Sequence, residues 1–198
     1  MSPDFKKEHE RGRSRLHGAV LIVIDVQQAF NHPRWGKRNN PEAERNVAKL
    51  LAEWRKTGRP IIHIQHVNPK PESLFNGPGV EVKPEAKPLH GEPVITKNVN
   101  SAFIGTDLQQ RLQSMGATKL VLVGLTTDHC VATTARMAGN YGFDTYVVSD
   151  ATATFERNGI REQKYTAEEM HDTALASLNG EFASIVSTED VLTSIKNN

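Results

Sequence analysis

Residues 119–143 read KLVLVGLTTDHCVATTARMAGNYGF, which predicts a strand, a short loop and a helix in direct succession. The aliphatic run at 119–124 is typical of a strand that is covered on both faces in a parallel sheet. Residues 128–141 are then predicted to form a helix, which Gly142 ends. This order predicts one unit of a parallel α/β sheet.

The same alternation of aliphatic runs and helical patterns extends in both directions along the chain. Further strands are expected at 18–27, 60–66, 93–97, 143–149 and 182–187, and further helices at 41–58, 106–115, 166–179 and 188–195. This spacing predicts a mostly parallel sheet with right-handed crossovers. We therefore expect an α/β fold, a single-domain three-layer sandwich with a six-stranded Rossmann-like sheet flanked by helices.

Length and composition limit the classes of protein to consider. At 198 residues the chain fits one domain with a single substantial core. The sequence shows no internal repeat or linker, so we expect one domain at 17–198 after a flexible tail at 1–16. The net charge of +1 does not predict a nucleic-acid partner. The longest apolar run, 19–24, is far too short to cross a membrane.

The cysteine content and the N-terminus together predict a cytoplasmic protein. The single cysteine cannot form an internal disulfide, and metal sites built on several thiolates are excluded. The N-terminus carries charged residues but no apolar stretch of signal-peptide length. These features are typical of a reducing compartment.

Three reactive side chains are expected at one edge of the sheet. In parallel α/β sheets the chemistry lies beyond the carboxyl ends of the strands. Asp25 ends the first predicted strand, Lys97 ends the third, and Cys130 follows the strand at 119–124. Although they are far apart in sequence, the predicted topology brings all three together.

Each of these residues has a chemical and a structural interpretation. At a helix start, Cys130 would meet backbone N–H groups that favour a thiolate, but a lone cysteine can equally be a buried structural residue. Asp25 follows six apolar residues, so partial burial would raise its pKa and suit it to proton transfer; the alternative is a turn cap. Lys97 could instead be an ordinary surface lysine.

Four motifs, taken together, point to a known family. They are LIVIDVQQAF around Asp25, VITKNVNSAF around Lys97, the stretch at 119–143 around Cys130, and VVSDATATF at 147–155. In their order and spacing the sequence resembles the isochorismatase-like cysteine hydrolases, a family that includes nicotinamidases and N-carbamoylsarcosine amidase. The resemblance covers about residues 17–195, nearly the whole chain.

The resemblance implies roles for these residues. Asp25 would take the thiol proton, Lys97 would stabilise the charges, and Cys130 would attack a carbonyl carbon. A cis peptide bond would join Leu125 and Thr126, and the amides of Thr126 and Cys130 would form the oxyanion hole. The family also implies a small-molecule substrate, no organic cofactor and a homo-oligomer, either a dimer or a larger assembly.

A metal site is not expected. The nicotinamidases that the sequence resembles hold a divalent ion with an Asp-x-His pair after the second strand, and here the corresponding residues are His66-Val67-Asn68. His63 and His66 lie three residues apart, so on a strand they face opposite sides and cannot chelate one ion. We predict a metal-free site.

The substrate class follows from the presence of the cysteine. Isochorismatases as a group need no cysteine nucleophile, whereas this chain keeps Cys130. An amide or carbamoyl C–N bond cleaved through a thioester is therefore the leading prediction. The alternatives are vinyl-ether hydrolysis of the isochorismatase type and a non-catalytic binding domain with the same fold.

Several other residues are candidates for the pocket. Phe30 and Trp35 are expected to bind substrate, although Phe30 could equally be a core residue. The long loop at 68–93 is typical of a lid or a pocket wall, from the same chain or a neighbouring subunit. His129 adjoins Cys130, but adjacent helical residues point about 100° apart, so a Cys–His pair is not expected.

Overall fold

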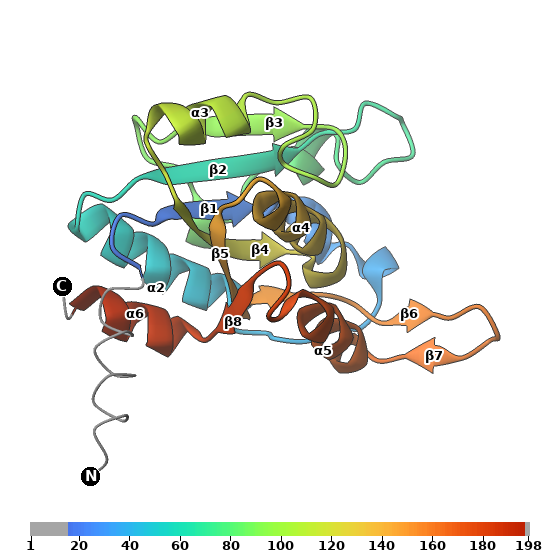
Figure 1. Cartoon of the computed structure of the whole chain (residues 1–198). Helices are drawn as coiled ribbons and strands as arrows, with labels where there is room; N and C mark the ends of the chain where they lie inside the picture. The colour runs from blue at the N-terminus through green and yellow to red at the C-terminus, as the bar shows by residue number, and fades with distance from the viewer. Residues whose placement is uncertain (1–15, 197–198) are drawn as a thin grey trace, which may run out of the picture.

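The computed structural model describes residues 16–196 and contains one central sheet (Figure 1). The predicted tail at 1–16 lies outside the described residues except for Leu16. The sheet has six strands in the order β3-β2-β1-β4-β5-β8, and every neighbouring pair is parallel. Its strands are β1 Val20–Ile24, β2 Ile61–His66, β3 Val94–Lys97, β4 Lys119–Leu125, β5 Asp144–Ala153 and β8 Ser184–Val186.

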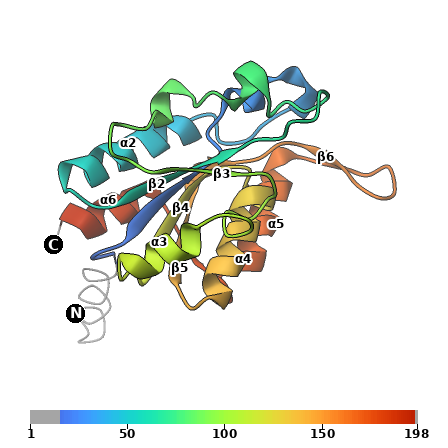
Figure 2. The same cartoon turned by 90° about the horizontal axis from the view of Figure 1, so that it is seen from above.

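Helices cover both faces of this sheet, which confirms the predicted three-layer α/β sandwich (Figure 2). One layer contains α2 Ala43–Lys56 and α6 Thr188–Lys196, and the other contains α3 Leu108–Ser114, α4 Ala132–Asn140 and α5 Ala167–Leu178. Alternate residues of β1 enter the two cores, with Leu21 and Val23 on one side and Ile22 on the other. The strand therefore has no polar face, as its sequence predicts.

Short helical turns occupy the connections. They are η1 Gln28–Asn31, η2 Pro33–Trp35, η3 Gly77–Val80, η4 Pro84–Ala86 and η5 Thr127–Val131. The last is one turn of π-helix and separates β4 from α4, so the helix predicted at 128–141 is regular only from Ala132. Such π turns are frequent at functional sites.

Several element boundaries differ from the sequence predictions, and one small element was not predicted. The strand predicted at 143–149 extends to Ala153, with a register shift against β4 between Leu122 and Gly124. The helix predicted from Thr106 begins at Leu108. A small antiparallel hairpin, β6 Arg157–Asn158 and β7 Lys164–Tyr165, was not predicted, because two-residue strands carry no periodic pattern.

The loop at 68–93 is fixed against the body of its own chain. The Lys83 ammonium lies 2.6 Å from the Glu44 carboxylate of α2, and its backbone N–H donates to Val26. The Gln27 side chain, just beyond β1, donates to the Val80 carbonyl. Together these contacts hold the second half of the loop against α2 and the end of β1. Within the described residues no helix is long and apolar enough to cross a membrane.

Candidate active site

The topology brings Asp25, Lys97 and Cys130 together beyond the carboxyl ends of three strands. Asp25 follows β1, Lys97 ends β3, and Cys130 lies in the π turn after β4. The Lys97 Nζ is 2.6 Å from Asp25 Oδ2 and 3.4 Å from Cys130 Sγ. All three residues are buried. The chain thus places an acid, a cation and a thiol in one buried cluster.

The Asp25 carboxylate is held in an unusual environment. Its backbone has a φ of 49°, in the left-handed region, and its side chain is fully buried. Oδ2 accepts the hydrogen bond from Lys97, whereas Oδ1 has no hydrogen-bond partner among the described residues. Burial raises the pKa of Asp25, and the Lys97 charge opposes that rise. Oδ1 is therefore a free acceptor with increased basicity.

The Cys130 thiol is protonated in this arrangement. Burial and then the negative charge of Asp25 raise its pKa to about 12, although Lys97 acts in the opposite direction. This corrects the expectation that a helix start makes the thiol acidic. Cys130 lies inside a π turn with its sulfur beside a carboxylate, and that charge and the loss of water outweigh the helix dipole.

His66 is a member of the site that the sequence interpretation missed. Lys97 Nζ lies 3.0 Å from His66 Nδ1, so the imidazole accepts and Nε2 carries the ring proton. Burial and the Lys97 charge lower the pKa of His66 to about 4, which keeps it neutral. The register that pairs His66 with Lys97 on neighbouring strands could have indicated this contact.

The geometry does not fit a metal ion. The ligand atoms of Asp25, His66 and Cys130 all lie within 4.8 Å of one another, a spacing that a cation could bridge. The Lys97 ammonium, however, already donates to all three of them. A metal ion here would lie beside a fixed positive charge. His63 points to the opposite face, where its Nε2 is 2.8 Å from Glu92.

The loop that carries the nucleophile is held from both sides. The Leu125–Thr126 peptide bond is cis. On one side, Thr127 Oγ1 lies 2.9 Å from Nδ1 of the buried His171 in α5. On the other side, Asp128 forms an ion pair with Arg157 at 3.2 Å. These contacts connect the loop to α5 and to the segment after β5.

His129 points away from this cluster. Its side chain is half exposed and lies 3.6 Å from the Asp128 carboxylate. Its Nδ1 lies 3.5 Å from Arg157. Its ring nitrogens therefore face Asp128 and Arg157, and Lys97 is the basic group that contacts the sulfur.

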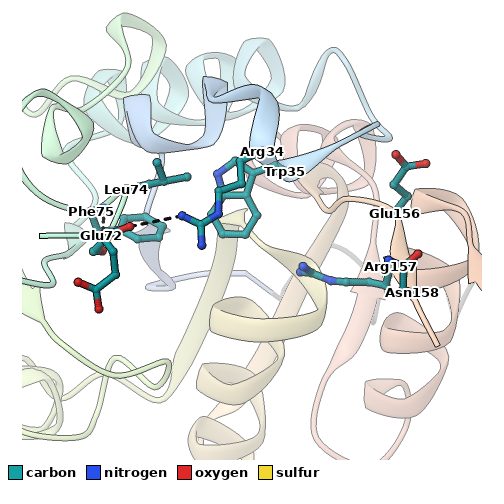
Figure 3. A pocket seen from close by; sticks show the side chains of 9 residues that line it. Arg34, Trp35, Glu72, Leu74, Phe75, Glu156, Arg157 and Asn158 are labelled. Carbon is teal, nitrogen blue, oxygen red and sulfur yellow. Dashed lines mark hydrogen bonds between the residues drawn. The ribbon is translucent and has the colours of Figure 1, made fainter. Parts of the chain in front are cut away.

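The structure also contains a cavity of about 430 Å³ (Figure 3). Its walls come from η2, the loop at 68–93 and the start of the β6–β7 hairpin, and they include Trp35, Phe75 and Arg157. The reactive residues do not line it, but Phe75 connects the two because its ring is 4.7 Å from that of His66. Two side chains, Phe75 and His66, thus separate the cavity from Lys97.

The two aromatic residues predicted to bind substrate have different positions. Trp35 lines the cavity, and its Nε1 donates to the Ala29 carbonyl at 2.9 Å. Phe30 is buried and does not line this cavity, so its contact with substrate stays a prediction. The Phe30 ring packs behind the wall, 5.1 Å from Trp35 and 5.2 Å from Phe75, because η1 turns it toward the core.

The family follows from a match to the isochorismatase domain over residues 19–190. The chain belongs to the isochorismatase family. It is 48% identical over 175 residues to the isochorismatase family protein YrdC of Bacillus subtilis, covering 87% of this chain and 94% of that protein. This isochorismatase-family chain is a hydrolase, as its relatives and structural neighbours are.

Solved structures and named relatives agree with this assignment. A hydrolase of the isochorismatase family from Chromobacterium violaceum has a TM-score of 0.89 and 41% identity, covering 91% of this chain and 94% of that one. Nicotinamidase 3 of Arabidopsis thaliana is 28% identical, covering 91% of this chain and 90% of that protein. A streptothricin hydrolase of Streptomyces noursei is 33% identical, covering 69% of this chain and 50% of that protein.

Proposed function

We propose that this protein is a cysteine hydrolase that cleaves a small amide or carbamoyl C–N bond through a thioester at Cys130. The observation that carries the proposal is the position of the Lys97 ammonium, 2.6 Å from the Asp25 carboxylate and 3.4 Å from the Cys130 sulfur. A nucleophile, an acceptor and a fixed charge within reach of one another are what acyl transfer requires. The nicotinamidase among the relatives carries an amidase name, which supports this bond type.

In the first half of the reaction, Asp25 accepts the thiol proton as the Cys130 sulfur attacks the carbonyl carbon. The raised pKa of Cys130 keeps the proton on sulfur at rest, and the raised pKa of Asp25 makes its carboxylate a stronger proton acceptor when a substrate binds. Lys97 then stabilises the new thiolate charge. The backbone amides of Thr126 and Cys130 are the proposed donors to the oxyanion. When the C–N bond breaks, protonated Asp25 returns the proton to the departing nitrogen.

The second half of the reaction removes the acyl group. Asp25 takes a proton from water, and the resulting hydroxide attacks the thioester carbonyl. The C–S bond breaks, the acid product leaves, and the proton returns to the Cys130 sulfur. No step requires a metal or an organic cofactor. The chemistry needs a free thiol, which agrees with the predicted reducing, cytoplasmic location.

A substrate screen tests the proposal. We expect the protein to release ammonia from members of a panel of small amides and carbamoyl compounds, and mass spectrometry to detect an acyl adduct on Cys130. The Cys130→Ala variant should lose both signals while keeping the far-UV circular dichroism spectrum of the wild type. Hydrolysis of isochorismate that persists in Cys130→Ala, without ammonia release from any amide, would instead support vinyl-ether chemistry.

A further inference from the structure

The cavity of Figure 3 has aromatic walls and cationic groups. The Trp35 and Phe75 rings lie with their centroids 6.2 Å apart and meet edge to face. Arg34 and Arg157 line the same space from different segments of the chain. A second hollow that shares both arginines also includes Lys164. In Figure 3 the Arg34 side chain points toward Glu72, and the Arg157 side chain points toward Trp35 from the opposite side of the cavity.

Arg34 has no carboxylate partner within residues 16–196. Its only side-chain hydrogen bond there is a 3.4 Å contact to the Glu72 carbonyl. Its backbone is fixed by η2, where the Arg34 N–H donates to His32 Nδ1 at 3.1 Å. An unpaired guanidinium on a fixed turn at a cavity is suited to bind an anion.

Asp128 holds the Arg157 guanidinium in place and leaves its Nη1 nitrogen available to a ligand. Its Nε and Nη2 both lie 3.2 Å from Asp128 Oδ2, which fixes the guanidinium plane. No acceptor in the described part of the chain contacts its Nη1. Because Asp128 lies two residues before Cys130, a group bound to this nitrogen would be close to the nucleophile loop.

Within the described residues, the acidic side chains of the wall form no ion pair with Arg34 or Arg157. The Glu156 carboxylate accepts a hydrogen bond from the Lys37 N–H at 3.0 Å, and the Glu72 carboxylate points away from the two guanidinium groups (Figure 3). An arginine without a carboxylate partner at a partly enclosed cavity, as Arg34 is within residues 16–196, attracts a negatively charged group of a substrate. The cavity volume of about 430 Å³ fits a small molecule.

We infer that the substrate is an anion: a small amide with a carboxylate that Arg34 and Arg157 bind, and a flat apolar part that packs against the Trp35 and Phe75 rings. The inference rests on the proposed function, because it assigns the substrate class of the same site. Charge-assisted hydrogen bonds to guanidinium groups select a carboxylate over a neutral group of the same shape.

Matched probe pairs test the inference. The probes are 3- and 4-carbamoylbenzoate and their methyl esters, which differ only in the charge. Calorimetry with Cys130→Ala measures binding without turnover, and ammonia release by the wild type measures kcat/KM. We expect the carboxylates to exceed the esters by at least about tenfold in both measurements.

Arginine variants locate the effect. Arg34→Met should reduce the carboxylate-to-ester ratio toward one, and Arg157→Lys should reduce it less because a charge remains. Arg45→Met is the matched control, since Arg45 is an exposed cation of α2 paired with Glu42, and it should keep the wild-type ratio. A ratio that Arg34→Met leaves unchanged would overturn the assignment of Arg34.

The possible outcomes separate the two proposals. Ammonia release from carboxylates and esters alike would overturn the inference and leave the proposed function intact. Carboxylate-selective binding to Cys130→Ala, with no ammonia release from any amide by the wild type, would support the inference and contradict the proposed function. Equal binding of both members of each pair, or binding of neither, would overturn the inference.

Discussion

The Asp25→Asn substitution removes the proton-accepting group of Asp25 while it keeps the shape of the side chain. Asparagine keeps the size and can still accept from Lys97, but it cannot take the Cys130 proton. We expect kcat to fall by roughly 10²–10⁴-fold, the usual range for general acid–base catalysis. The measurement is the rate of acyl adduct formation at Cys130 by mass spectrometry. The control is Asp107→Asn, which changes an exposed residue paired with Arg111 of α3 and should retain the wild-type rate. If Asp25→Asn formed the acyl adduct as fast as the wild type, the assignment of Asp25 as proton acceptor would be wrong.

The Cys130 thiol should label slowly at neutral pH. Burial and the Asp25 charge raise its pKa to about 12, so the thiolate fraction, and with it the iodoacetamide rate, should rise steadily from pH 7 to pH 10 without a plateau. Lys97→Met removes a charge that lowers this pKa and should slow labelling further. The test is a pH series of labelling rates on the wild type and this variant. A labelling rate that levels off at or below the pKa of an ordinary thiol would contradict a protonated resting state of Cys130.

At the scale of elements, the buried ion pair between Lys83 and Glu44 fixes the loop at 68–93 to α2. Their charged atoms are 2.6 Å apart, and both side chains are largely buried. Lys83→Met removes one partner, and breaking such a pair destabilises a fold by about 3–5 kcal/mol. The Arg38–Glu44 pair remains, so we expect a loss at the lower end of this range. Urea unfolding measures this loss of stability. The matched control is Lys56→Met, because Lys56 is exposed. Equal unfolding midpoints for the two variants would show that the Lys83–Glu44 ion pair adds no stability.

At the scale of the whole molecule, acid should destabilise the fold in two steps. The folded-state pKa of His66 is lowered from 6.5 to about 4, so its contribution to stability is complete above pH 6.5 and is lost as the pH falls toward 4. The pKa of Glu44 is lowered from 4.5 to about 2, so its contribution is complete above pH 4.5 and is lost below that value.

Urea unfolding at pH 7, 5.5, 4 and 3 tests this expectation. The free energy of unfolding should decrease at each step. His66→Asn should reduce the slope between pH 6.5 and pH 4, although the lowered pKa values of His63, His129 and His171 act in the same direction. A stability that is constant from pH 7 to pH 4 would contradict the neutral state of these histidines.

We also propose that the molecule assembles into a homo-oligomer. β3 is an edge strand, and Val94, Val99 and Ile104 on or near it are 46%, 40% and 48% exposed. Edge strands with exposed apolar side chains are suited to pair with another chain. Light scattering should give a mass above the 22.0 kDa of one chain, and Val94→Lys should shift it toward that value. A monomeric wild type at micromolar concentration would overturn this proposal.

The strands and helices, their parallel α/β arrangement and the grouping of the reactive residues could be predicted from the sequence, because they follow from local patterns. The aliphatic runs predict buried parallel strands, and polar residues directly after such runs must meet at the carboxyl edge of the sheet. The sequence therefore predicts Asp25, Lys97 and Cys130 at one place. In the structure, the Asp25 carboxylate and the Cys130 sulfur lie within hydrogen-bonding distance of the Lys97 ammonium. The match to the isochorismatase domain over residues 19–190 includes all three residues.

Contacts that depend on burial and on distant segments were decided only by the tertiary structure. The Cys130 thiol is a weak acid because Asp25, more than one hundred residues earlier in the chain, places its charge beside a sulfur that is withdrawn from water. Likewise, Phe30 supports the pocket from the core, and Arg34 and Arg157 share a cavity across two loops. Local sequence fixes the period of a strand or helix, whereas pKa values and cavity walls depend on which distant atoms exclude water.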